Sequence, residues 1–266
     1  MDKVIISLAP VAADSTQVNP LDVAHEAIEA AREGASIVHL HVREKNGQLT
    51  DNLTCFEQTI QPIIAKTGMI IQASTGGISD MNIQQRCAPL SCQGVEMASL
   101  NVGSVNLAGT IYKNSPEDVA WCSNEIVKKN IMPEFEVFEL GMINNILELS
   151  ESINFKNPML FNIVLGHTGS TPSNIDTLIA MRQFIPKDAL WAITDFGRQD
   201  FSVIAAAIAM GACEVRIGFE DSRYLTKTTQ AKQNSELVKK LKNIITSMDK
   251  DVASIAEARE VLNLTS

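Results

Sequence analysis

Residues 34–44 read GASIVHLHVRE, and this stretch contains the unit on which the predicted fold is built. Gly34 follows a segment of helical periodicity, and glycine is favoured just past the end of a helix. The apolar run that comes next, residues 36–41, predicts a short buried strand. A helix that leads directly into a buried strand is typical of βα repeats around a parallel sheet.

Short apolar runs alternate with longer helical segments along the whole chain. The predicted strands cover residues 4–9, 36–41, 69–73, 94–98, 131–138, 159–165, 189–194 and 214–218. The predicted helices cover residues 20–33, 53–66, 82–87, 116–129, 142–150, 175–184, 201–210 and 231–249, and an extra C-terminal helix follows Asp251. Eight such repeats predict a single TIM-type (β/α)8 barrel domain over residues 1–266. A doubly wound open sheet is the alternative, but no G-x-G-x-x-G turn follows the first strand.

Length and composition fit one such domain. The 266 residues are 45% hydrophobic and 20% charged, the balance of a soluble globular protein. A net charge of −9 argues against nucleic acid and anionic membranes as partners. We expect a cytoplasmic protein, because the first apolar run is too short for a signal peptide and no stretch is long enough for a membrane span. The five cysteines include no C-x-x-C pair, which indicates reduced thiols.

His39 and His41 are the first candidates for chemistry. They are two residues apart on a predicted strand, so their side chains point to the same face. They come where the strand ends, which is the end at which barrel enzymes build their sites. Glu220 follows the last predicted strand, and closing the barrel brings it towards the histidines. Two histidines and a carboxylate leave open positions on a divalent ion, as in catalytic zinc sites. Ordinary buried polar groups in the barrel lumen are the alternative.

Polar residues also occur at the ends of other predicted strands. Ser74 and Gly77 follow the third strand, in a turn whose amides and hydroxyls can approach an anion such as a carboxylate. Ser99 and Asn101 follow the fourth strand, and Glu136 lies on the fifth. Burying such groups costs stability unless they are paired or used. Their repetition at successive strand ends favours one shared site, with capped strand ends as the alternative.

Two further features lie at the same predicted end. Arg216 and Asp221, five residues apart near the last strand, could form an ion pair. That pair could belong to the site, or it could be an ordinary salt bridge at the barrel rim. His167 follows the sixth strand and could contact a substrate or act as an acid. His25 falls within an amphipathic helix and is expected to be a plain surface or partly buried residue.

Five motifs, in this order, resemble the β-keto acid cleavage enzymes, a family whose named member acts on 3-keto-5-aminohexanoate. The motifs are GASIVHLHVRE at 34–44, STGG at 74–77, EMASLNVGS at 96–104, PEFEVFE at 133–139 and VRIGFED at 215–221. The resemblance implies a zinc-dependent barrel that condenses a β-keto acid with acetyl-CoA and then cleaves the adduct to acetoacetate and a new CoA thioester. It also implies an acyltransferase of lysine degradation that assembles as a homo-oligomer, either a dimer or a tetramer.

The same resemblance assigns the reaction centre. By motif match, His39, His41 and Glu220 would bind zinc or another divalent metal. The bound metal would polarise the keto oxygen, so that the adjacent carbon loses a proton more easily. Asp221 would be the base that takes this proton, and Arg216 would orient and tune it.

The resemblance also assigns substrate contacts. Ser74, Gly77 and Ser99 would hold the substrate carboxylate and keto group. Asn101 would support them. Glu136 matches a family glutamate near the distal end of the substrate, where a carboxylate favours a cationic substrate.

Three positions depart from the family pattern and bear on substrate identity. Asp14, a predicted substrate contact, matches a family glutamate and is one methylene shorter. Ser99 stands in place of a threonine. Residues 166–169, Gly-His-Thr-Gly, replace a loop more usually similar to Gly-Val-Pro-Gly-Gly.

Two other function classes remain open at this stage. One is a metal-dependent hydrolase of the H-x-H barrel type, although such enzymes generally need further histidines and only His25 and His167 remain. The other is a non-catalytic metal- or acyl-CoA-binding protein, which would have no need for Asp221 as a base.

Overall fold

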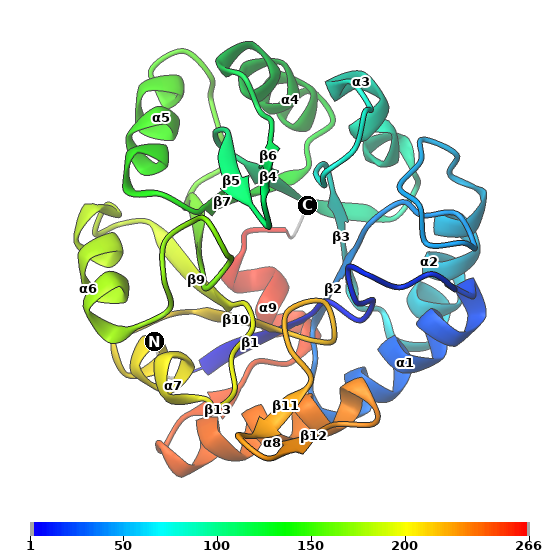
Figure 1. The fold of residues 1–266 in the computed structure, drawn as a ribbon, viewed down its shortest axis with the longest axis vertical. Helices are drawn as coiled ribbons and strands as arrows, with labels where there is room; N and C mark the ends of the chain where they lie inside the picture. The colour runs from blue at the N-terminus through cyan, green and yellow to red at the C-terminus, as the bar shows by residue number, and fades with distance from the viewer. Residues whose placement is uncertain (1–2, 265–266) are drawn as a thin grey trace.

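Eight parallel strands close into a barrel at the centre of the computed structural model, which describes residues 3–264 (Figure 1). The strand order is β10-β9-β8-β7-β4-β3-β2-β1, and β10 also pairs with β1, which closes the sheet. The barrel strands are β1 (Lys3–Leu8), β2 (Ile37–Leu40), β3 (Ile70–Ser74), β4 (Val95–Asn101), β7 (Met132–Val137), β8 (Leu160–Leu165), β9 (Leu190–Asp195) and β10 (Glu214–Ile217). The predicted closed barrel is confirmed.

A helix follows each barrel strand and lies outside the sheet (Figure 1). These helices are α1 (Pro20–Glu33), α2 (Thr54–Thr67), α3 (Ile83–Arg86, extended by the 3-10 turn η1, Ala88–Ser91), α4 (Pro116–Lys128), α5 (Leu140–Ser150), α6 (Ile175–Phe184), α7 (Ser202–Ala209) and α8 (Asn234–Ser247). Gly34 ends α1 as predicted, with φ +123°, and the Asn19 side chain caps the first turn of this helix.

The amino-terminal end of the barrel has an apolar floor. The first inward-facing residues of the strands, among them Ile5, Ile37 and Met97, form one buried cluster with Ala258 and Leu262. Ala258 belongs to the predicted extra helix, α9 (Ile255–Val261), which lies behind the barrel opening in Figure 1. A short strand, β13 (Asp251–Val252), pairs with the start of β1 and leads into this helix. Because α9 closes this end, a binding site is left to the carboxyl ends of the strands.

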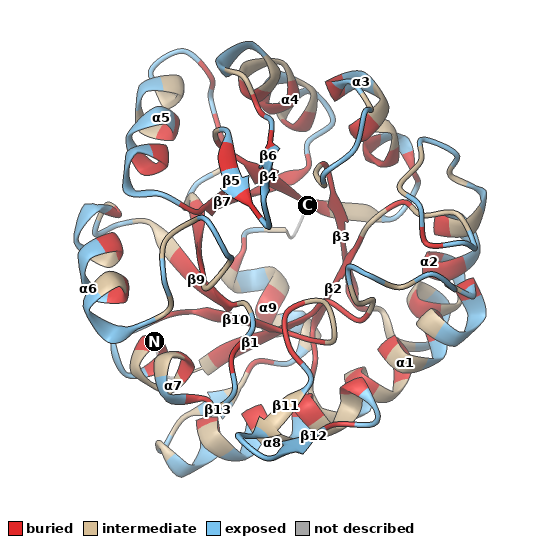
Figure 2. Ribbon diagram, in the orientation of Figure 1, coloured by how far each residue is buried: buried red, intermediate tan, exposed pale blue. Residues whose placement is uncertain are grey.

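Directly above the floor, each barrel strand has a buried polar residue. We call this set the polar layer, and it consists of Ser7, His39, Gln72, Ser99, Glu134, Asn162, Thr194 and Glu214. Most of its members lie two residues beyond a floor residue of the same strand, which is the period at which strand side chains return to one face. Figure 2 shows these strands as buried almost throughout.

Two short hairpins at the carboxyl end were not predicted. The first joins β5 (Val105–Leu107) to β6 (Thr110–Tyr112) through Ala108 and Gly109, which both have positive φ. The second joins β11 (Tyr224–Thr226) to β12 (Thr229–Gln230). Two-residue hairpin turns usually carry Asn-Gly or Asp-Gly, so Ala-Gly gave no turn signal.

Some predicted boundaries move by a few residues. β4 runs to Asn101 rather than ending at residue 98, so two candidate site residues lie within the strand. α8 begins at Asn234 rather than at residue 231, and α5 begins two residues earlier than predicted, at Leu140. All five cysteines are free thiols, as expected. Among the described residues, no helix has both the length and the apolar character needed to cross a membrane.

Replacing Gly218 with alanine is expected to destabilise the barrel closure. Gly218 has φ +146°, and a Cβ there would lie 2.1 Å from the carbonyl oxygen of Ala9 at the end of β1. Gly218→Ala should therefore lower the free energy of unfolding by roughly 1–3 kcal/mol in chemical denaturation. The control is Gly141→Ala in α5, where a Cβ meets nothing within 4 Å and the change should be neutral or slightly stabilising. Equal stability of the two variants would contradict the steric argument.

Candidate metal centre and active site

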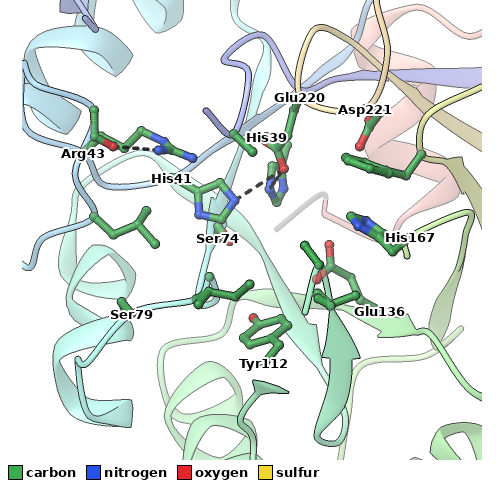
Figure 3. Close-up of a pocket in the computed structure, with 18 of the residues that line it drawn as sticks. His39, His41, Arg43, Ser74, Ser79, Tyr112, Glu136, His167, Glu220 and Asp221 are labelled. Carbon is green, nitrogen blue, oxygen red and sulfur yellow. Dashed lines mark hydrogen bonds and ion pairs between the residues drawn. The ribbon is translucent and has the colours of Figure 1, made fainter. Parts of the chain in front are cut away.

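A cavity of about 610 Å³ opens at the carboxyl end of the barrel. Its walls carry most of the candidate residues from the sequence, and Figure 3 shows them pointing towards a common space. Most of its wall is formed by β2, β3 and the loops after them, by the β5–β6 hairpin, by β7, by the loops after β8 and β9, and by the turn after β10. The histidines and the carboxylates therefore meet through the closure of the barrel.

His39, His41 and Glu220 form a cluster suited to a metal ion. Their candidate ligand atoms all lie within 4.8 Å of one another. Oε1 of Glu220 lies 3.7 Å from Nε2 of His39 and 3.4 Å from Nε2 of His41. Nε2 of His39 is buried and has no hydrogen-bond partner within the described chain. Burial, together with the nearby Arg216 guanidinium, lowers the pKa of His39 to about 3, so its imidazole is neutral and can donate a lone pair. This donor set fits a divalent ion such as zinc.

The turn that carries Glu220 is held in place by backbone contacts. The backbone N–H of Glu220 donates to the carbonyl of Ala9, 3.2 Å away. Asn234, at the start of α8, is buried, and its Oδ1 accepts the backbone N–H of Phe219 at 3.0 Å. Its Nδ2 donates to the carbonyl of Pro10 at 3.1 Å. One side chain thus ties the turn after β10 to the loop after β1, which fixes the direction of Glu220.

Arg216 joins the carboxylates of the site. Its Nη2 and Nε donate to the two oxygens of Asp221 at 2.7 and 3.2 Å, which forms the ion pair that the sequence suggested. Its Nη1 donates to Oε1 of Glu136 at 3.0 Å, and Nη2 lies 3.5 Å from Glu220. Burial raises the pKa of Asp221, although the Arg216 guanidinium opposes this shift. A carboxylate with a raised pKa is a stronger base.

The predicted substrate contacts do not all lie at equal depth. Ser74, Gly77 and Glu136 line the cavity. Ser99 and Asn101 do not line it but are buried on β4 next to residues that do, since Ser99 pairs with Ser74 and Asn101 with Glu136. Oγ of Ser99 and both side-chain polar atoms of Asn101 have no hydrogen-bond partner within the described chain. Such unpartnered groups are available to a ligand that reaches them.

Asp14 is the predicted contact that the structure does not bring to the cavity. It lies exposed in the loop between β1 and α1, and its neighbour Ala13 lines the cavity instead. The proposed contact of Asp14 with substrate therefore needs a movement of this loop and stays a prediction.

His167 lies at the cavity wall between two aromatic rings. It stacks on Phe196 with ring centroids 3.8 Å apart, and the Phe138 ring centroid lies 5.6 Å away. Burial lowers the pKa of His167 to about 4, helped by the positive charge of Arg216. At neutral pH the imidazole is therefore uncharged, which suits a contact with a substrate better than the role of an acid.

Arg43 and Tyr112 are among the cavity residues that the sequence analysis did not identify. Arg43 continues the period of two that links His39 to His41, and this spacing could have identified it. Its guanidinium donates to the carbonyl of Gly47 and takes part in no ion pair within residues 3–264, so an anion entering the cavity would find its charge available. Tyr112 comes from the unpredicted hairpin, and no sequence signal placed it here.

Comparisons with known proteins agree with the geometry. Residues 3–264 match the family model described as beta-keto acid cleavage enzyme. The chain belongs to this family.

Two curated relatives match almost end to end. A 3-keto-5-aminohexanoate cleavage enzyme of Fusobacterium nucleatum is 35% identical, over 99% of each chain. A 3,5-dioxohexanoate:acetyl-CoA acetone transferase of Paraburkholderia graminis is 28% identical, over 98% of this chain and 96% of the relative. A solved complex of ObcA with a C4-CoA adduct and oxalate superposes with a TM-score of 0.78 at 18% identity, covering 94% of this chain and 67% of that one, and supports the fold alone.

Removal of one proposed ligand should abolish tight metal binding. His41→Ala leaves two ligands, so we expect the zinc affinity to fall by at least about 100-fold. This loss is larger than the one usually caused by replacing a residue that only hydrogen-bonds to a metal ligand. Competition with a chromophoric chelator measures the affinity. His25→Ala is the matched control, because His25 lies exposed on α1 outside the cavity. Unchanged zinc affinity of His41→Ala would rule out the cluster as the metal site.

Proposed function

We propose that this chain transfers the acyl group of a β-keto acid to CoA in a zinc-dependent reaction with acetyl-CoA. In the overall reaction R–CO–CH2–COO⁻ and acetyl-CoA give acetoacetate and R–CO–CoA. One carbon–carbon bond forms, between the carbon next to the substrate carboxylate and the acetyl carbonyl. One carbon–carbon bond breaks, between that same carbon and the substrate keto carbon. The carbon–sulfur bond of acetyl-CoA also breaks, and the same sulfur forms a new bond to the substrate keto carbon, so no oxidant or reductant is needed.

The observation that carries this proposal is the position of Asp221 next to the metal cluster. Asp221 follows the proposed ligand Glu220 directly and lines the same cavity as both histidines. A metal and a base at one point suit the removal of a proton from a carbon next to a keto group. A family model that matches residues 3–264 supports the same chemistry.

The contacts support Asp221 as the base and indicate how it is oriented. A bound divalent ion would supply electrophilic stabilisation of negative charge on a keto oxygen. Asp221 would take the proton from the carbon between the keto and carboxylate groups. Arg216 holds both oxygens of Asp221, so the carboxylate has one fixed orientation. Once Asp221 is neutral, Arg216 still has Glu136 as an acceptor, which keeps the guanidinium in place during proton transfer.

The end of β3 and the turn after it, next to His41, offer a place for the substrate carboxylate. Ser74, the last residue of β3, and Gly77 line the cavity there, and Ser99 and Asn101 offer unpartnered donors beside them. We propose that these four residues bind the carboxylate and the keto group. Arg43 adds an available positive charge on the histidine side, where either anionic reactant could meet it.

We further propose a β-keto acid that carries an amino group, such as 3-keto-5-aminohexanoate. The support is the 35% identical relative, whose name specifies this substrate. Burial raises the pKa of Glu136 to about 7, against the effect of Arg216, and an ammonium group nearby would favour its ionised form. Only one oxygen of Glu136 accepts from Arg216, so the other is free to accept from a substrate amine within the described site.

The two alternative function classes are less well supported. An H-x-H hydrolase would need further histidine ligands, but His167 is the one other described histidine in the cavity and it stacks on Phe196. A non-catalytic binding protein would not need the carboxylate pair built around Arg216. Assembly as a dimer or tetramer, a cytoplasmic location and a place in lysine degradation stay predictions, of which sedimentation can test the first.

Replacement of the proposed base should stop turnover without loss of metal. Asp221→Asn keeps the shape of the side chain but removes the basic oxygen, so kcat should fall by about 10²–10⁴-fold. Mass spectrometry of acetoacetate and the new thioester, formed from acetyl-CoA and a panel of β-keto acids, measures the rate. Asp176→Asn, at an exposed position of α6, is the control. Wild-type turnover in Asp221→Asn would overturn the assigned base, and plain hydrolysis products would favour the hydrolase.

The charge of Glu136 should matter most for cationic substrates. Glu136→Gln retains an acceptor for Arg216, but it removes the negative charge opposite the proposed amine. We expect KM for an amino-bearing keto acid to rise by about 10-fold, equivalent to roughly 1.4 kcal/mol of binding, while KM for a neutral analogue changes little. Steady-state kinetics with both substrates measures the difference, and an equal rise for both would refute the proposed contact.

A further inference from the structure

A chain of hydrogen bonds runs from His39 through the polar layer of the lumen. Nδ1 of His39 lies 2.7 Å from Oε1 of Gln72, the residue directly opposite on β3. Nε2 of Gln72 then donates to Oε2 of Glu134 on β7, at 2.6 Å. Gln72 and Glu134 are both fully buried, so water does not compete for these groups. His39 lines the cavity above, but Gln72 and Glu134 do not.

The chemistry of these three side chains fixes the direction of each hydrogen bond. A carboxylate only accepts, so the Gln72 atom that faces Glu134 must be the NH2 nitrogen. The other end of that amide, facing His39, must then be the carbonyl oxygen. A carbonyl only accepts, and therefore Nδ1 of His39 must carry the proton. Nε2 is left with its lone pair, and this is the nitrogen that faces Glu220.

Glu134 is itself held on its other side. Its Oε1 accepts from Nδ2 of Asn162 on β8, at 2.6 Å. Asn162 in turn exchanges hydrogen bonds with the hydroxyl of Thr194 on β9, at 2.9 and 3.1 Å. The Glu134 carboxylate therefore has an amide donor on each oxygen and cannot turn away from Gln72 without leaving a buried group unpaired.

We propose that Gln72 and Glu134 are positioning residues that hold His39 in its Nδ1-protonated tautomer, with Nε2 directed at the metal. Groups that accept from the second nitrogen of a ligand histidine set its tautomer and ring orientation. Here the acceptor is a neutral amide, and the carboxylate stands one residue further back. The inference rests on the proposed role of His39 as a ligand.

Loss of either positioning residue should weaken metal binding. Gln72→Met removes the acceptor at similar volume, and Glu134→Gln lets the Gln72 amide turn over. Each variant should lose about 10–100-fold in zinc affinity, measured by chelator competition. The visible spectrum of the Co²⁺-loaded variants should change as well. Ser123→Ala is the control, since Ser123 is an equally buried hydroxyl without a hydrogen-bond partner in the described chain and lies on α4, outside the lumen.

An exchange of the two side chains separates positioning from a general loss of structure. In the double variant Gln72→Glu with Glu134→Gln, the carboxylate at position 72 can accept from both His39 and the new amide, and that amide can still accept from Asn162. The double variant should recover most of the zinc affinity that Glu134→Gln loses. If Gln72→Met fails to fold, the comparison of Glu134→Gln with the double variant still tests the positioning role.

The tautomer can be measured without metal, because the chain has only four histidines. The ¹⁵N shifts of His39 in the metal-free wild type should indicate the Nδ1–H form, and Glu134→Gln should give a mixture. Wild-type affinity in both single variants, or an equal loss in Ser123→Ala, would overturn the inference. Absence of zinc binding by the wild type would instead overturn the proposed function, so the two failures are distinguishable.

Discussion

The pairing of β10 with β1 is the constraint on which the site depends. The register from Ile5–Glu214 to Leu8–Ile217 closes the sheet and makes β10 and β2 the neighbours of β1 within the barrel. In an open sheet of the same strand order, Glu220 and the two histidines would belong to strands near opposite edges. Gly218 permits the close approach to Ala9 that this closure requires. The cluster of His39, His41 and Glu220 therefore forms because the barrel closes, and no single strand contains it.

Depth in the lumen follows from the period of two along each strand. Ile37 of β2 belongs to the floor, His39 of β2 to the polar layer, and His41, directly after the strand, to the cavity wall. A polar layer inside a barrel costs stability unless its groups are paired. Around His39 they are paired in a chain, whereas Ser99 and Asn101 keep unpartnered atoms beside the cavity. The paired side of the layer is suited to holding a ligand residue still, and the unpaired side is suited to receiving a substrate.

Much of the fold could be predicted from the sequence, because the signals for strands and helices are local. Eight apolar runs gave the barrel, and the extra helix was correctly expected after Asp251. The hairpin through Ala108 was missed because alanine rarely adopts positive φ. The end of β4 was placed too early because the polar residues Ser99 and Asn101 interrupt its apolar run, although the lumen accommodates them.

The sequence by itself determined the alternation of elements, the shared face of His39 and His41, and the family, since each depends on neighbouring residues or on motifs in order. Only the tertiary structure decided which groups meet. Arg216 could have paired with any carboxylate near it, and packing gave it Asp221 and Glu136 together. Asp14 matched a family position, yet the loop holds it away from the cavity. Contacts between strands depend on closure and register, and these are properties of the whole sheet.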